Sequence, residues 1–175
     1  MLDLKTLQLG DILLFQGKSF ISRGIMYFTK SKYSHAALYI GGGENYIIEA
    51  TGAGVEKNLV APLIAQADAF CVRRIPDLTV ENAELMKDKA YSLIYSSYDT
   101  KQLLSLGVYY TLRKLGLNWD WLVSNNPQRI TCSELVAVAC LCIPLKFAAK
   151  VKDVTPETLY LSNKLVTVVE SYTKE

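Results

Sequence analysis

Short apolar runs separated by turn residues fill the first part of the chain. Residues 10–15, 34–40, 44–50, 54–60 and 69–75 are rich in aliphatic, β-branched or aromatic side chains and are bounded by glycine, proline or polar residues. Runs of this kind predict the strands of an antiparallel sheet. Between the first two runs, residues 19–30 place apolar side chains near helical spacing and predict a short amphipathic helix.

The second half of the chain changes to helical periodicity. Thr79 can cap a helix that reaches about residue 93, with Leu85, Met86 and Ala90 on its inner face. A second helix is predicted from residue 99 or 100 to Gly116. The loop that follows, residues 118–129, carries two tryptophans that could form a hydrophobic lid over a site or fill the core. A short helix over 155–161 and a strand over 164–169 complete the pattern.

A cysteine stands at the start of the most clearly marked helix. Thr131 is a good N-cap, and Glu134 completes a capping box with it. Cys132 then occupies the first helical position, where the helix dipole favours the thiolate, the nucleophilic form of the side chain. The apolar run from 135 to 143 predicts a buried helix that ends before Pro144. Cys132 is therefore either a nucleophile or one more small buried side chain.

The glycine-centred hairpin predicts a partner for the single histidine. If residues 41–43 form the loop, His35 lies directly opposite Glu49 on the same face of the two strands. The residues of the other face are apolar and would point to the core. A slip of one residue would destroy the pairing, because it moves one partner to the opposite face. The pair is either part of a catalytic site or a polar contact on a solvated face.

Composition excludes several classes of protein. The chain of 175 residues has about the length of one domain, so residues 1–175 are expected to form a single unit. A net charge of +2 without charged runs gives no nucleic-acid footprint. No apolar run is long enough to span a membrane. No secretory signal is visible, and together with reduced thiols this favours the cytoplasm.

The cysteines do not form a metal motif. None of the pairs among the four has the spacing of a zinc site, and one histidine leaves few other ligands, so no metal and no organic cofactor is expected. Cys71, Cys140 and Cys142 are predicted to lie in the core. A thiol nucleophile needs a base, and a histidine held by a carboxylate suits that role near neutral pH. Cys132, His35 and Glu49 together therefore suggest nucleophilic catalysis.

Several separated segments resemble NlpC-type papain-like cysteine peptidases. The segments are Gly10-Asp11-Ile12-Leu13-Leu14-Phe15, then Ser34-His35-Ala36-Ala37-Leu38-Tyr39-Ile40-Gly41, then Ile48-Glu49-Ala50. Thr131-Cys132-Ser133-Glu134-Leu135-Val136 follows them, whereas in the standard members the cysteine helix comes first. This order, and the later Thr155-Pro156-Glu157-Thr158-Leu159, is similar to the circularly permuted YiiX-like branch. Ala36-Ala37 departs from the Val-Gly that usually follows the histidine.

The resemblance implies an α+β, permuted papain-like fold, with the cysteine helix packed on a barrel-like antiparallel sheet. It implies Cys132 as nucleophile, His35 as general base and acid, and Glu49 as the residue that orients the imidazole. Tyr98 would help to bind the oxyanion or serve only in packing, and Ser34 and Ser133 are further candidates for substrate binding.

The expected activity is hydrolysis of an amide bond in a small peptide, an amino-acid amide or a related substrate, through an acyl-enzyme. Two alternatives stay open. One is an acyltransferase or thioesterase that acts on lipid or thioester acyl groups. The other is a binding module of the same fold without turnover. The sequence does not determine the oligomeric state.

Overall fold

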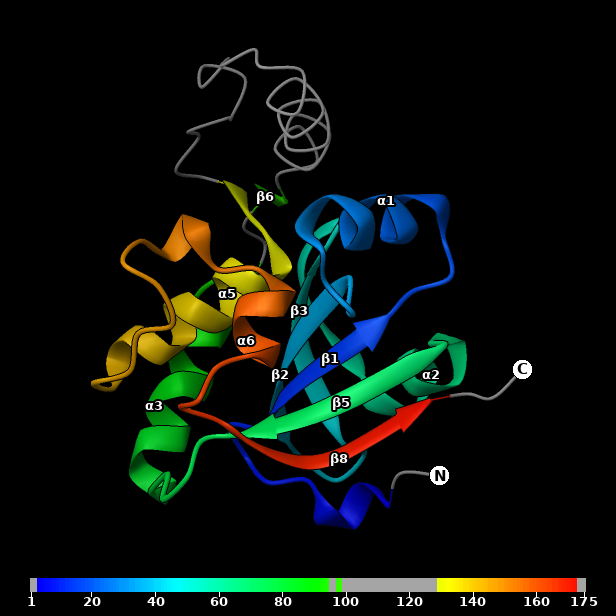
Figure 1. Cartoon of the computed structure of the whole chain (residues 1–175). Coiled ribbons are helices and arrows are strands. Elements are labelled where there is room, and N and C mark those ends of the chain that lie inside the picture. Colours follow the sequence, from blue (N-terminus) through cyan, green and yellow to red (C-terminus); the bar gives the residue numbers. More distant parts are fainter. Residues whose placement is uncertain (1–2, 95–96, 99–128, 173–175) are drawn as a thin grey trace.

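The computed structural model describes residues 3–94, 97–98 and 129–172 (Figure 1). Its centre is a six-stranded antiparallel sheet with the strand order β4-β3-β2-β1-β5-β8. Strands β4 and β8 are the two edges, so the sheet is open and does not close into the expected barrel. The strands are β1 (Ile12–Gln16), β2 (His35–Gly41), β3 (Tyr46–Thr51), β4 (Gly54–Leu59), β5 (Ala69–Arg74) and β8 (Val166–Tyr172).

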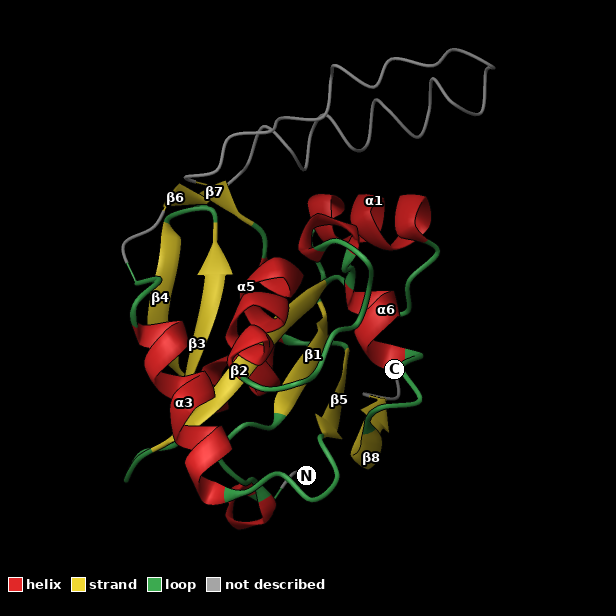
Figure 2. Cartoon of the chain, turned by 90° about the vertical axis from the view of Figure 1, so that its left-hand side faces the viewer, coloured by secondary structure: helices red, strands yellow, loops and turns green. Residues whose placement is uncertain are grey.

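Helices cover both faces of this sheet (Figures 1 and 2). The cysteine helix α5 packs on β2 and β3, and α3 packs against α5 and β2. Helix α2 lies on the opposite face, and a two-stranded parallel sheet of β6 and β7 leads into α5. The remaining elements are η1 (Leu4–Thr6), α1 (Phe20–Thr29), α2 (Val60–Gln66), α3 (Val80–Tyr91), β6 (Ser97–Tyr98), β7 (Arg129–Ile130), α5 (Cys132–Ala139), η3 (Cys140–Cys142), η4 (Val151–Asp153) and α6 (Pro156–Tyr160).

The alternation of residues along the hairpin divides the core into two layers. Leu38 and Ile48 belong to the layer under α5, as the sequence predicts. Tyr39 and Ile47 face the other way and are buried with Val60 of α2. The second face of the hairpin is therefore not solvated, and the histidine and glutamate that share it lie at the margin of a core.

The register of the hairpin differs from the predicted one by two residues. Glu49 lies opposite Ala37 rather than His35, and the pairing shifts again between Tyr39 and Gly41. The loop is longer than the three glycines, and Asn45 takes a left-handed φ of 61° within it. Because side chains alternate with a period of two, a shift of two residues leaves His35 and Glu49 on the same face.

The Gly10-Asp11 turn joins the start of β1 to the end of β5. Gly10 has a φ of 90°, in the left-handed region that favours glycine. The Asp11 carboxylate is buried and accepts two hydrogen bonds of 2.7 Å from the Arg74 guanidinium. It also accepts the backbone N–H of Gln8 at 2.8 Å. This motif therefore links the two strands and stabilises the sheet.

Within the described residues the predicted helices are present, but the cysteine helix ends at Ala139, and Leu85, Leu141 and Cys142 are exposed rather than buried. Thr79 caps α3 as predicted, and Met86 and Ala90 are fully buried, but Leu85 is 49% exposed. Cys142 is exposed as well, because the chain leaves α5 in a 3-10 turn that carries it out of the core. The predicted helix from residue 99 or 100 to 116, and the tryptophan-containing loop over 118–128, lie outside the described residues.

Candidate active site

The helix that carries Cys132 begins as the sequence predicts. The Thr131 hydroxyl accepts the N–H of Glu134, and the Glu134 carboxylate accepts the N–H of Thr131 at 2.8 Å. This capping box uses neither the N–H of Cys132 nor that of Ser133. Two backbone donors therefore remain at the positive end of the helix dipole, next to the Cys132 sulfur.

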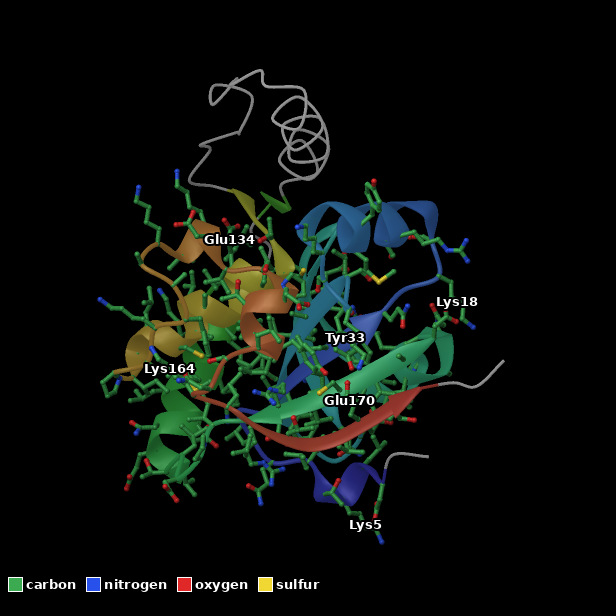
Figure 3. The ribbon with its side chains drawn as sticks, in the orientation of Figure 1. Lys5, Lys18, Tyr33, Glu134, Lys164 and Glu170 are labelled. Carbon is green, nitrogen blue, oxygen red and sulfur yellow. The ribbon has the colours of Figure 1, made fainter. Side chains whose placement is uncertain are left out.

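A polar cluster, formed by Lys32, Tyr33, Tyr160 and Glu170, fixes the chain that leads into β2. The Glu170 carboxylate accepts hydrogen bonds from Lys32 at 2.6 Å and from Tyr33 at 2.7 Å. Tyr160 donates a third at 3.1 Å. Figure 3 labels Tyr33 and Glu170 at this point, where β8 passes beside β5. Tyr33 lies two residues before His35, so the cluster anchors the chain close to the start of β2.

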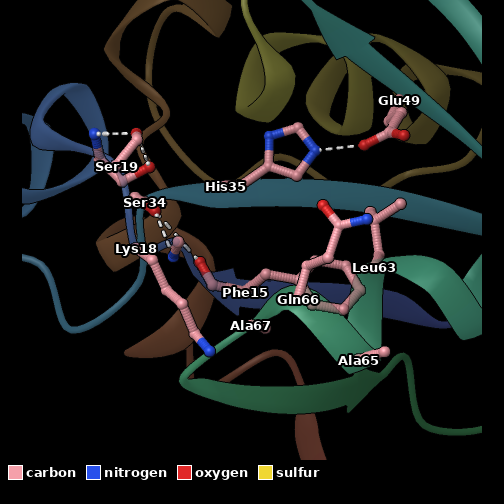
Figure 4. Close-up of a pocket in the computed structure, with 12 residues that line it drawn as sticks. Phe15, Lys18, Ser19, Ser34, His35, Glu49, Leu63, Ala65, Gln66 and Ala67 are labelled. Atoms are coloured by element: carbon pink, nitrogen blue, oxygen red, sulfur yellow. Dashed lines mark hydrogen bonds and ion pairs between the residues drawn. The ribbon is translucent and has the colours of Figure 1, made fainter.

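The His35 imidazole and the Glu49 carboxylate face each other across the hairpin (Figure 4). His35 Nε2 lies 2.5 Å from Glu49 Oε2, and the Glu49 side chain is only 4% exposed. Asn58 of β4 donates from Nδ2 to the other oxygen, Oε1, at 2.9 Å. The sequence did not single out Asn58, whose signal is only its position on a strand that pairs with β3. Both oxygens of the buried carboxylate are thus engaged.

The thiol of Cys132 forms the second contact of the imidazole. Cys132 lies close enough to the imidazole to act on the pKa of His35, as Glu49 does. Since Nε2 faces Glu49, the other ring nitrogen, Nδ1, is the one left for the sulfur. Burial lowers the pKa of His35, but hydrogen bonds and negative charge from Cys132 and Glu49 outweigh burial and raise the pKa to about 10. The imidazolium form is therefore favoured when its two partners are anionic.

The pKa of Glu49 is shifted in the opposite direction from that of His35. Burial would raise the pKa of its carboxyl, but the hydrogen bond and positive charge of His35, together with the Asn58 hydrogen bond, hold it below the usual value. A sulfur, an imidazole and a carboxylate in this arrangement can serve as a nucleophile, a base and an orienting acid.

The other cysteines are placed differently. Burial raises the pKa of the Cys71 thiol to about 11 and that of Cys140 to about 12. These two thiols are protonated near neutral pH and closed off from solvent. Cys142 is exposed. Within the described part of the chain, Cys132 alone combines a helix start with a neighbouring imidazole.

The three remaining predicted site residues differ in their surroundings. The backbone of Tyr98 pairs with Ile130, two residues before the cysteine, and its side chain lies outside the described part of the chain. The Ser34 hydroxyl accepts the N–H of Gly17 at 3.0 Å and lines a pocket beside His35. The Ser133 hydroxyl donates to the Val154 carbonyl at 2.7 Å inside the core.

Neither a metal-binding cluster nor a membrane-spanning helix is found among the described residues. No group of three or more His, Cys, Asp or Glu side chains in this part of the chain could hold a metal ion. Within the same residues, every helix is too short or too polar to serve as a membrane span.

Comparison with known proteins identifies relatives of the chain. A sequence profile described as "Permuted papain-like amidase enzyme, YaeF/YiiX, C92 family" matches residues 6–169. The "Probable lipoprotein peptidase YaeF" of Escherichia coli (strain K12) is 30% identical over 106 residues, which make up 61% of the chain. The match spans only 38% of the length of that relative.

A solved structure described as metalloprotein yiiX, from Escherichia coli O157:H7, shares the fold. It superposes with a TM-score of 0.73 at 21% sequence identity, over 94% of this chain and 98% of the other. The family profile covers nearly all of the described sheet and the whole of the cysteine helix α5. The permuted order of the motifs is thereby confirmed, and the chain belongs to the permuted papain-like amidase family of YaeF and YiiX.

Proposed function

We propose that the protein is a cysteine amidase that cleaves small peptides or related amides through a Cys132 acyl-enzyme. The observation that carries the proposal is the position of the His35 imidazole, which hydrogen-bonds to the buried Glu49 carboxylate and also lies close enough to the Cys132 thiol for the two groups to interact. Membership of an amidase family supports the same activity.

The residues supply each step of amide cleavage. The Cys132 thiolate attacks the carbonyl carbon, and the imidazolium of His35 protonates the leaving amine as the C–N bond breaks. Water then attacks the thioester, His35 takes its proton, and the thiolate leaves. Glu49 keeps Nδ1 directed at the sulfur and stabilises the imidazolium, while Asn58 holds Glu49 in place.

The oxyanion needs donors that point at the carbonyl oxygen. The N–H of Cys132 is not used by the capping box and is the first such donor. Tyr98 is the proposed second donor, because β6 runs beside the strand that enters the cysteine helix. Ser34 is proposed to position the loop beside His35. Ser133 is left out of the catalytic set, since its hydroxyl is bound to Val154.

Thiol labelling followed by acyl-enzyme trapping tests the proposal. At pH 6, iodoacetamide should label Cys132 at least tenfold faster than the exposed Cys142, and the difference should disappear in His35→Ala. A thioester or p-nitrophenyl ester of a short N-acyl amino acid should leave one acyl group on Cys132, detected by mass spectrometry. Equal labelling of both thiols, or no acyl adduct, would refute the proposed activity.

The expected cytoplasmic location stays a prediction. The relative named as a lipoprotein peptidase carries a name that points to a membrane-attached protein, and that name describes the relative alone. Cell fractionation with an antibody against the chain would decide between the two locations.

A further inference from the structure

A pocket of about 600 Å³ lies directly beside the catalytic imidazole. Its walls come from the end of β1, the start of α1, the start of β2 and helix α2 (Figure 4). His35 and Glu49 belong to its lining, whereas Cys132 is not among the residues that line it. The pocket therefore lies on the side of the imidazole and carboxylate, away from the sulfur.

This position assigns the pocket to one half of the substrate. During attack the carbonyl carbon binds the Cys132 sulfur, so the acyl group stays with the sulfur. The nitrogen that leaves must lie within hydrogen-bonding reach of the His35 imidazole, which gives it a proton. The substituents of that nitrogen consequently extend past the imidazole, into the space that the pocket provides.

The walls of the pocket favour an apolar group next to the imidazole. Phe15 lies opposite His35 in the β1–β2 pairing, and the two rings are 6.3 Å apart between centroids. Leu63 of α2 and the methyl groups of Ala65 and Ala67 continue the apolar wall. A side chain carried by the leaving amine can bury apolar surface here.

The far end of the pocket is polar and carries one cation. Figure 4 shows Lys18, Ser19 and Ser34 together on one side of His35, with Leu63 on the other. The charges of His35 and Glu49 balance each other. Among the described residues that line the pocket, the positive charge of Lys18 therefore has no negative counterpart. Lys18 pairs with Asp68 at 3.5 Å, and both side chains are largely exposed. Exposed pairs are weak, so a substrate carboxylate can replace Asp68.

We propose that the pocket is the leaving-group subsite of the enzyme and binds an amine that carries an apolar side chain and a carboxylate. Such an amine is the last residue, or the last two residues, of a peptide. This inference rests on the proposed amidase activity, because the pocket is given its role by proton transfer from His35.

Attack of added amines on the acyl-enzyme tests the leaving-group subsite while the acyl group stays the same. An added amine attacks the thioester carbon on Cys132, its proton passes to His35, and the C–S bond breaks to release a new amide and the thiolate. The experiment uses the full chain, an N-acyl amino-acid thioester as donor, and four nucleophiles: leucine, leucinamide, leucyl-alanine and leucyl-alaninamide. The ratio of new amide to hydrolysis product is measured by liquid chromatography.

We expect interception to saturate with nucleophile concentration and to favour the carboxylate over the matching amide in at least one pair. In Lys18→Met that preference should fall by about twofold to fivefold, the size of an exposed ion pair. Comparing the two proteins cancels the different basicities of the amines. Lys5→Met is the matched control, because Lys5 lies near the N-terminus at the far end of the sheet, and its ratio should equal that of the wild type (Figure 3).

A second pair of variants tests the apolar wall. Leu63→Ala should raise the half-saturating concentration of leucyl-alanine by about threefold or more, because buried apolar surface is lost. Leu161→Ala, at a position that directly follows α6, is 68% exposed and does not line the pocket, should leave it unchanged. An acyl-enzyme that is intercepted without saturation, or with equal ratios in wild type and Lys18→Met, would overturn the subsite alone. Absence of any acyl-enzyme would overturn the proposed activity as well.

Discussion

Replacement of Asn58 by alanine should slow catalysis although Asn58 touches neither the thiol nor the imidazole. Its side chain donates to Glu49 Oε1 at 2.9 Å, and Glu49 is buried. A hydrogen bond to a charged group contributes about 1.5 to 3 kcal/mol. If Asn58→Ala loses this contribution in the transition state, where His35 is an imidazolium, kcat/KM falls by about tenfold to a hundredfold. About 1.4 kcal/mol corresponds to a factor of ten.

The pH profile separates this effect from a general loss of structure. Asn58 is one of the groups that lower the pKa of Glu49, so its removal raises that pKa. A group with a depressed pKa loses its charge when the pH falls through the folded value. The acidic limb of the kcat/KM profile should therefore move to higher pH in Asn58→Ala, with KM changed less than kcat.

Two controls make the prediction refutable. Lys57→Ala alters the preceding residue, whose ammonium lies over the Tyr46 ring, and should keep the wild-type profile. In a Glu49→Ala background, Asn58→Ala should have no further effect on kcat/KM, because the two residues act as a unit. Additive losses in the double variant, or activity within twofold of wild type in Asn58→Ala, would refute the reasoning.

Three further outcomes are expected. The pKa of His35 is raised to about 10 in the folded protein. Its ionic contacts therefore stabilise the fold fully below about pH 6.5, the usual pKa of histidine, and this stabilisation is lost as the pH rises through the folded pKa. Thermal unfolding should show a larger fall in Tm from pH 7 to pH 10 in the wild type than in Cys132→Ala. Arg74→Met leaves the buried Asp11 without its cation and should lower the free energy of unfolding by about 3 kcal/mol in a urea titration, whereas an unchanged midpoint would contradict the described pair. Glu170→Gln removes the charge on which three donors converge and should reduce both Tm and the rate of iodoacetamide labelling of Cys132; a lower Tm with an unchanged rate would limit the cluster to stability.

The hairpin shows how far local sequence patterns determine this site. Alternation of apolar residues placed His35 and Glu49 on one face, because that property depends only on a period of two. The register itself was wrong by two residues, since it depends on the left-handed φ of Asn45 and on the irregular pairing near Gly41. The diagonal placement still lets the long glutamate side chain reach the imidazole.

Long-range contacts could not be predicted from the residues alone. Capping signals at Thr131 and Glu134 fixed the helix start because they are local. Asn58 has no local signal, since its role follows from the pairing of β4 with β3. The pocket likewise depends on how α2 packs beside β1, which no pattern in either segment specifies. The resemblance to a permuted family supplied the link between the cysteine helix and the hairpin.

The polar cluster at Glu170 also affects the order in which the protein matures. During synthesis the histidine hairpin leaves the ribosome well before the cysteine helix, and the strand that carries Glu170 follows later still. Lys32 and Tyr33 have no carboxylate partner from β8 until that strand joins β5. The contacts that hold the segment before His35 to the sheet are therefore completed only when the last strand of the sheet is in place.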